Sequence, residues 1–193
     1  VAGSDTAVIT FAQPFNDTPI VMASPGQYAV TVSPYPVITR VFDVTKEGFK
    51  VILLRQSGVT AKSVRSCDVS YVAIERGQTL DGSGHVVTVR DTTITFTSTL
   101  TNYKFFYGND DLLANPKVLV QMQSYDVPCY SVLRTYGTGP TEYYHRVRLQ
   151  TDDTNAEYGT VSSTKKYTER VGYIVVSDED GSVTTGIRNV DAT

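Results

Sequence analysis

The chain has no tryptophan, only two histidines and only two cysteines among its 193 residues. His85 and His145 do not stand at metal-ligand spacing and no Cys-x-x-Cys motif occurs, so the sequence predicts no metal site. We interpret Cys67 and Cys129 as separate buried thiols, with a disulfide between them as the alternative. The phosphate-binding, nucleophile-elbow and dinucleotide motifs are also missing, so we expect neither a cofactor nor a catalytic residue.

Positive charge and long apolar runs are scarce as well. The formal net charge is −3 and the isoelectric point is about 5.3, so no general basic field attracts nucleic acid or an acidic membrane surface. The lysines and arginines are scattered along the sequence rather than clustered. No apolar run approaches the roughly 20 residues that a membrane span requires. Asn16-Asp17-Thr18 is a glycosylation sequon, which is used only on a secretory route.

What the sequence does contain is a succession of short runs rich in β-branched and aromatic residues. Glycine, proline, asparagine and aspartate separate these runs, which is typical of strands, and no stretch shows sustained helical periodicity. We therefore predict an all-β, antiparallel fold. The runs are 7–11, 19–23, 37–44, 49–54, 69–74, 86–89, 93–96 and 116–120. Residues 76–84 are predicted to be a linker or turn, and 105–115 and 151–166 polar insertions.

The two halves of the chain repeat the same order of motifs. Pro34-Tyr35-Pro36, Gly48-Phe49 and Tyr71-Val72 are followed, at nearly equal spacing, by Cys129-Tyr130-Ser131, Tyr143-Tyr144 and Tyr173-Ile174. An internal duplication predicts two tandem β-sandwich domains, residues 1–84 and 85–193. The strand led by Val86 is expected either to serve the second domain or to bridge both. Residues 183–190 are either an unpaired edge strand or an ordinary strand of the second domain.

Aromatic and charged residues near the predicted loops provide the candidate binding residues. Tyrosine rings can stack on the apolar C–H face of a sugar, while arginine and aspartate bind its hydroxyl groups through charge-assisted hydrogen bonds. Packing at strand ends is the alternative role for the tyrosines. The candidate ligand-binding residues are Tyr28, Tyr35, Arg40, Tyr125, Asp126, Tyr130 and Arg134.

The first half resembles the H-type lectin domain family. It contains Phe11-x-x-Pro14-Phe15-x-x-x-Pro19-Ile20-Val21, then Val44-Thr45-x-x-Gly48-Phe49-x-Val51, then Val69-Ser70-Tyr71-Val72-Ala73-Ile74. The second half keeps Asn115-Pro116-Lys117-Val118 and Val171-Gly172-Tyr173-Ile174-Val175-Val176. Its opening reads Phe96-Thr97-Ser98-Thr99-Leu100, and Tyr143-Tyr144 stands at the Gly-Phe position. The resemblance thus implies two copies, of which the second has diverged.

The resemblance implies a six-stranded antiparallel sandwich per copy, trimers, and non-catalytic sugar binding between units. The sugar is often galactose or N-acetylgalactosamine, and Arg40, in the strand before the Gly-Phe hinge, is the foremost candidate contact. A glycan partner, a homo-oligomer and an extracellular, surface or virion location are expected, with no nucleic acid and no membrane insertion. Two alternatives stay open. One is a structural module that assembles a fibre, filament or phage or virion appendage without sugar. The other is a hydrolase whose deep cleft holds either two carboxylates or a Ser-His pair; Asp110-Asp111 is one acidic pair in the sequence.

Overall fold

The computed structural model describes residues 6–28, 37–55, 67–80, 86–96, 102–107, 115–126, 131–135, 144–151 and 166–177. These residues form an all-β, antiparallel structure, as the sequence predicts. The strands are β1 (Thr6–Thr10), β2 (Ile20–Tyr28), β3 (Val37–Phe42), β4 (Gly48–Arg55), β5 (Cys67–Ile74), β6 (Gly77–Leu80), β7 (Val86–Phe96), β8 (Asn102–Phe106), β9 (Lys117–Met122), β10 (Ser131–Thr135), β11 (Tyr144–Thr151) and β12 (Tyr167–Val176).

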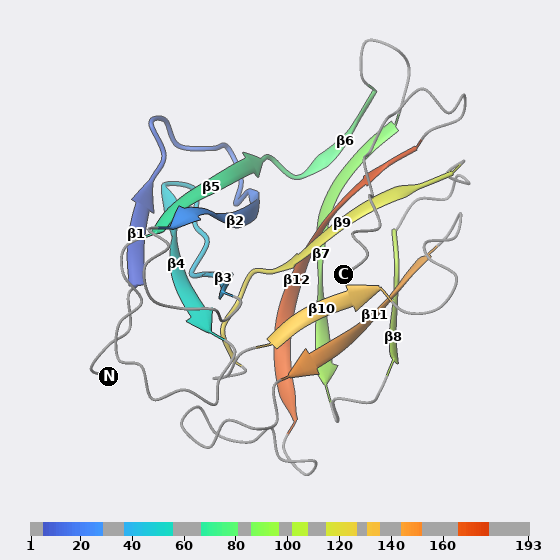
Figure 1. Cartoon of the computed structure of the whole chain (residues 1–193). Coiled ribbons are helices and arrows are strands. Elements are labelled where there is room, and N and C mark those ends of the chain that lie inside the picture. The colour runs from blue at the N-terminus through green and yellow to red at the C-terminus, as the bar shows by residue number, and fades with distance from the viewer. Residues whose placement is uncertain are drawn as a thin grey trace.

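Strands β1–β5, the N-terminal part, form two antiparallel sheets that pack face to face (Figure 1). One sheet has the order β1-β4-β3 and the other pairs β2 with β5. Alternate residues of each strand point inward and bury an apolar cluster that includes Val21, Val41, Phe49 and Val51. Phe11 closes this cluster, and its ring lies 5.0 Å from that of Phe15 in an edge-to-face contact.

The turn between β3 and β4 explains the Thr45-x-x-Gly48 motif. The Thr45 hydroxyl accepts hydrogen bonds from the backbone N–H groups of Glu47 and Gly48, each at 3.2 Å. A Cβ atom on Gly48 would lie 2.1 Å from the carbonyl oxygen of Ile9 on β1. Glycine is needed here because β1 and β4 approach too closely for any side chain.

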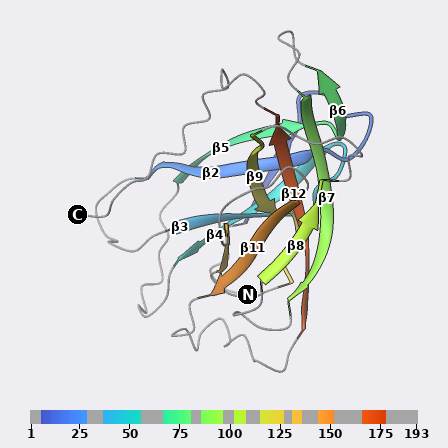
Figure 2. The same cartoon turned by 90° about the vertical axis from the view of Figure 1, so that its right-hand side faces the viewer.

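Strands β6–β12, the C-terminal part, form a sheet of order β6-β7-β12-β9 and a second of order β10-β11-β8 (Figure 2). The prediction of a linker was wrong for Gly77–Leu80, because these residues form β6 and pair with β7. The predicted insertion 105–115 likewise overlaps the end of β8 at Phe105 and Phe106. The strand led by Val86 pairs with β6 and β12, and so lies in a sheet of the C-terminal part.

The pairing order of β1–β5 recurs in β8–β12. β4 lies between β1 and β3 as β11 lies between β8 and β10, and β5 pairs with β2 as β12 pairs with β9. Each part also has a group of packed aromatic rings. Phe49 and Tyr71 pack with Phe11 in the N-terminal part, and Tyr173 and His145 pack around Phe105 in the other. That the second half is a divergent copy stays a prediction.

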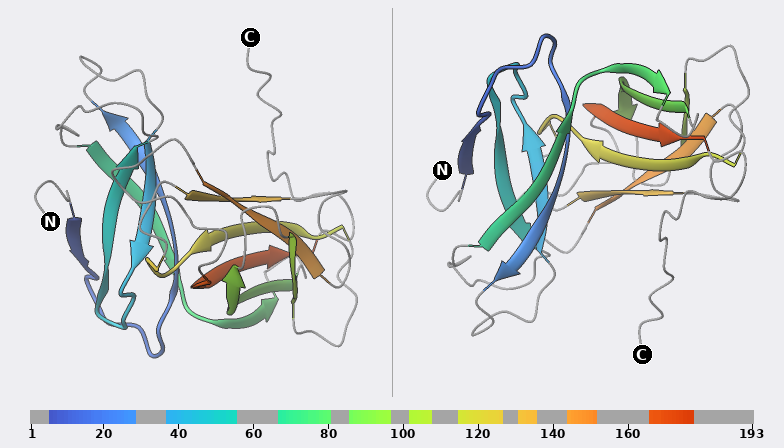
Figure 3. Two further views of the ribbon diagram at one scale, coloured as in Figure 1. Left: turned by 90° about the horizontal axis from the view of Figure 1, so that it is seen from below. Right: turned by 90° about the horizontal axis from the view of Figure 1, so that it is seen from above.

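The N-terminal and C-terminal parts lie against each other (Figures 1 and 3), and glutamine side chains form a ladder of hydrogen bonds between them. The Gln123 amide accepts from Val21 N at 3.0 Å and donates to Val21 O at 2.7 Å. The Gln121 amide bonds Ala23 in the same way, at 2.6 and 3.1 Å. Gln121 is on β9 and Gln123 follows its last residue, Met122. Both side chains bond the backbone edge of β2, so they replace a neighbouring strand. An open strand edge is otherwise a template for pairing with another chain.

An apolar cluster completes the contact beside the ladder. Ile20 of β2 packs against Val89 of β7 and Ile174 of β12. Gly172 lies directly at this contact, where an added Cβ would stand 2.7 Å from the Ile20 Cγ2 atom and 2.9 Å from the Gln123 Cγ atom. The bare backbone of Gly172 therefore allows the two parts to approach this closely.

His145 is buried in the C-terminal core, and this makes stability depend on pH. Burial lowers its pKa from 6.5 to about 4, so the folded state holds the neutral ring where the unfolded chain binds a proton. Stability should therefore fall as the pH drops from 6.5 toward 4, by up to about 3 kcal/mol. In His145→Phe, urea unfolding at several pH values should show a weaker pH dependence in this window. An unchanged dependence would contradict the assignment.

Candidate functional site

Arg40, the foremost sequence candidate, is buried between the two parts. Only 1% of its side chain is exposed, and its Nη1 atom lies 3.1 Å from the Glu169 carboxylate, which is fully buried. The guanidinium also donates to the carbonyl and hydroxyl oxygens of Ser131. Because Arg40 is on β3 and Glu169 on β12, this ion pair links a sheet of the N-terminal part to one of the C-terminal part.

Three of the candidates meet at this ion pair. Glu169 accepts a hydrogen bond from the backbone N–H of Asp126 at 3.1 Å. The exposed Asp126 carboxylate in turn accepts from the backbone N–H of Thr168 at 2.6 Å. The half-buried ring of Tyr125 lies 5.7 Å from the Arg40 guanidinium carbon. The structure thus places Arg40 beside Tyr125 and Asp126, although Arg40 is far from them in the sequence.

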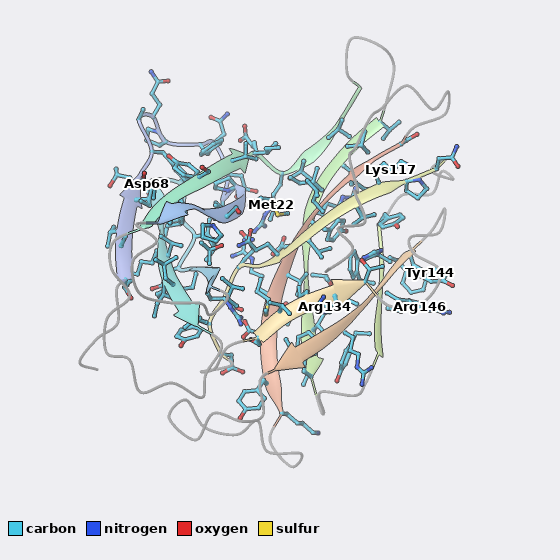
Figure 4. All side chains as sticks on the ribbon, in the orientation of Figure 1. Met22, Asp68, Lys117, Arg134, Tyr144 and Arg146 are labelled. Atoms are coloured by element: carbon cyan, nitrogen blue, oxygen red, sulfur yellow. The ribbon has the colours of Figure 1, made fainter. Side chains whose placement is uncertain are left out.

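The other candidates lie elsewhere. Arg134 is exposed on β10 and is visible there in Figure 4. Tyr28 ends β2, where its backbone pairs with Cys67, but its side chain is not described. Tyr35 and Tyr130 lie outside the described residues, as do His85, Cys129 and residues 183–190.

The Tyr125 ring lies beside the ring of Phe42, a residue that was not among the predicted candidates. The two rings come from opposite parts and their centroids are 5.7 Å apart, tilted by 41°. Both are half-buried, and the exposed Asp126 follows Tyr125 in the chain. An aromatic pair beside a carboxylate is chemistry that suits a sugar, since rings stack on C–H groups and carboxylates accept from hydroxyls. No local sequence signal links Phe42 to Tyr125, because only the packing of the two parts joins them.

Two hollows flank the glutamine ladder. The first, of about 280 Å³, lies between β2, β3, β9 and β10, with Thr39, Gln121 and Ser131 as polar lining residues. The second, of about 460 Å³, is mostly apolar and is lined by Met22, Tyr71, Val72 and Leu119 among others. Met22 is marked in Figure 4. Val72 and Leu119 are 51% and 60% exposed, so this hollow presents a connected apolar surface.

Within the described residues, no group of three or more His, Cys, Asp or Glu side chains could hold a metal ion. In the same residues, no helix is long and apolar enough to cross a membrane.

Breaking the Arg40–Glu169 pair should destabilise the fold strongly. Arg40→Met leaves the Glu169 carboxylate buried without its cation, which costs about 3–5 kcal/mol, whereas the double variant Arg40→Met/Glu169→Leu should lose less than the two single variants together. Urea unfolding would measure this. Lys50→Met is the matched control, because its pair with Asp43 is exposed and should contribute less than about 1 kcal/mol. A loss from Arg40→Met no larger than that of the control would contradict a structural role.

Comparison with known proteins finds a family model that matches the N-terminal part. Residues 6–74 match the family model of the H-type lectin domain, and this range begins with β1 and ends with β5. No curated protein and no solved structure matches the chain. The match confirms the family resemblance of the first half of the sequence.

Proposed function

We propose that the protein is a non-catalytic, carbohydrate-binding module. The observation that supports this most directly is the match of residues 6–74 to the H-type lectin domain, a family of sugar-binding domains. Both parts have a sandwich arrangement of antiparallel sheets, and the proposal includes the second half as a divergent lectin-like domain. It also includes a secreted or surface-associated location and a galactose-type glycan as the partner.

We place the sugar on the surface formed by Phe42, Tyr125 and Asp126. The Tyr125 ring, held by the Arg40 guanidinium behind it, offers an apolar face for the C–H groups of the sugar. Asp126 is exposed, and a carboxylate that accepts one backbone hydrogen bond has further lone pairs for a hydroxyl group. In this arrangement Arg40 positions Tyr125 instead of contacting the sugar, because its guanidinium is already engaged by Glu169 and Ser131.

Removing the Tyr125 ring should weaken sugar binding without unfolding the protein. Tyr125→Ala is expected to lower affinity for N-acetylgalactosamine and galactose about tenfold in titration calorimetry, and Tyr125→Phe should retain most of it. Val8→Ala, a truncation of another exposed side chain on β1, is the control for nonspecific effects. A wild-type protein that binds no sugar on a glycan array would overturn the proposed function, and equal binding by Tyr125→Ala would overturn the location.

The apolar hollow favours a second candidate function, self-assembly of a fibre or appendage. Tyr71, Val72 and Leu119 expose 42%, 51% and 60% of their surface around one hollow. Connected exposed apolar surface of this kind commonly marks a protein–protein contact. Its occupant in this hypothesis is a second copy of the chain.

If copies associate through this hollow, a charge placed in it should prevent association. The wild-type chain is expected to form oligomers in light scattering without any ligand, and Leu119→Glu should convert them to monomers, because an unpaired carboxylate is costly to bury. Val8→Glu adds the same charge on an exposed β1 site and should leave assembly intact. A wild type that is monomeric at every concentration would exclude this function.

A further inference from the structure

The outward side of the β10-β11-β8 sheet combines cations and aromatic rings. Side chains alternate along a strand, and Phe105, Val147 and Leu149 point into the C-terminal core. Their sequence neighbours therefore point away from it. We call this outward surface the basic face; its residues are Lys104, Phe106, Arg134, Tyr144, Arg146 and Arg148. Figure 4 shows Tyr144 and Arg146 on β11 and Arg134 on β10.

Like charges lie directly opposite one another on the basic face. The register of β11 with β8 places Arg146 across from Lys104, and its register with β10 places Arg148 across from Arg134. Opposed like charges destabilise a sheet. Within the described part of the chain, Lys104, Arg134 and Arg146 have no acidic side chain within ion-pair distance. These three cations occur in a chain of net charge −3, and they suit an anionic ligand.

The rings on the basic face indicate what kind of anion fits. Lys104 Nζ and the Arg146 guanidinium carbon lie 4.3 and 5.3 Å from the centre of the Tyr144 ring, and Arg146 also donates to the Tyr144 hydroxyl at 3.2 Å. Tyr144 thus positions two cations and is poorly placed to stack on a nucleobase. The Phe106 ring, 62% exposed and 5.8 Å from that of Tyr144, offers one apolar platform beside the cations.

We propose that the basic face binds an anionic glycan, with its sulfate or carboxylate groups on Lys104, Arg134, Arg146 and Arg148 and a sugar ring against Phe106. This site goes beyond the proposed function. It lies on β8, β10 and β11 instead of beside Phe42 and Tyr125, and it would distinguish charged glycans from neutral ones. Neighbouring strands are about 4.8 Å apart and alternate residues about 7 Å apart, so the cations form a grid suited to several anionic groups of one oligosaccharide.

The test compares two variants that each remove two positive charges. Lys104→Gln/Arg134→Gln takes one cation from each opposed pair of the basic face. Lys50→Gln/Lys117→Gln removes the same charge from β4 and β9. Binding of a chondroitin 4-sulfate hexasaccharide, its desulfated form and neutral chitohexaose is measured by calorimetry at about 50 and 300 mM NaCl, with thermal unfolding of each protein. N-acetylgalactosamine is titrated separately, so failure of the proposed sugar site is distinguished from failure of the basic face.

The wild type should bind the sulfated hexasaccharide, more weakly at high salt, and chitohexaose hardly at all. If the desulfated form, which keeps its carboxylates, still binds, carboxylates are sufficient. If it no longer binds, sulfate groups are required. The basic-face variant should bind about tenfold more weakly than the control variant, without a lower melting temperature, because like-charge repulsion is relieved. Equal weakening in both variants, no binding by the wild type, or tighter binding of an oligothymidylate would overturn the proposal.

Discussion

The buried ion pair of Arg40 and Glu169 holds the two parts of the chain together, and it thereby determines which surfaces stay available for ligands. Two charges removed from water are tolerated only when partners surround them. Here Arg40 of the N-terminal part enters a set of partners that the C-terminal part supplies, namely Ser131, which accepts from Arg40, and the Asp126 backbone, which donates to Glu169. The glutamine ladder adds a second polar contact of the same kind, along the edge of β2. Because both contacts are directional, they fix the relative position of the two parts more sharply than apolar packing alone would.

Much of the scaffold could be predicted, because strands are local features. The apolar runs located most strands to within a few residues, and Tyr71 and Tyr173 occupy matching positions, opposite Ala23 on β2 and Val120 on β9. β6 was not predicted because it begins with Gly77 and Gln78, which are not typical of strands, and it is stabilised by pairing with β7. The role of Arg40 could not be predicted, since alternation shows that it points away from its own core but not that another part of the chain covers it.

In β11, the alignment of the two halves of the sequence differs from the structure by one residue. The sequence aligned Phe49 with Tyr144, yet the residue beside Phe105 in the C-terminal core is His145, while Tyr144 points outward to the basic face. In a strand, such a shift moves every side chain to the opposite side of the sheet. The lysines and arginines look scattered in the sequence because those of the basic face come from three separate strands, β8, β10 and β11. The alternation Tyr144-x-Arg146-x-Arg148 was the available signal, and it acquires meaning only when β8 and β10 are placed beside β11.

The topology also limits where ligands can bind. Part of the outward side of β3 is covered by contacts such as that of Arg40, and β12 and β9 contact β2 through Ile174 and Gln121. Among the described residues, no hydrogen bond or apolar cluster that joins the two parts uses the outward side chains of β8 and β11. A sheet surface that is not needed for assembly of the fold can hold opposed cations at a cost in stability. Such a cost is most easily explained by a ligand that compensates the charge.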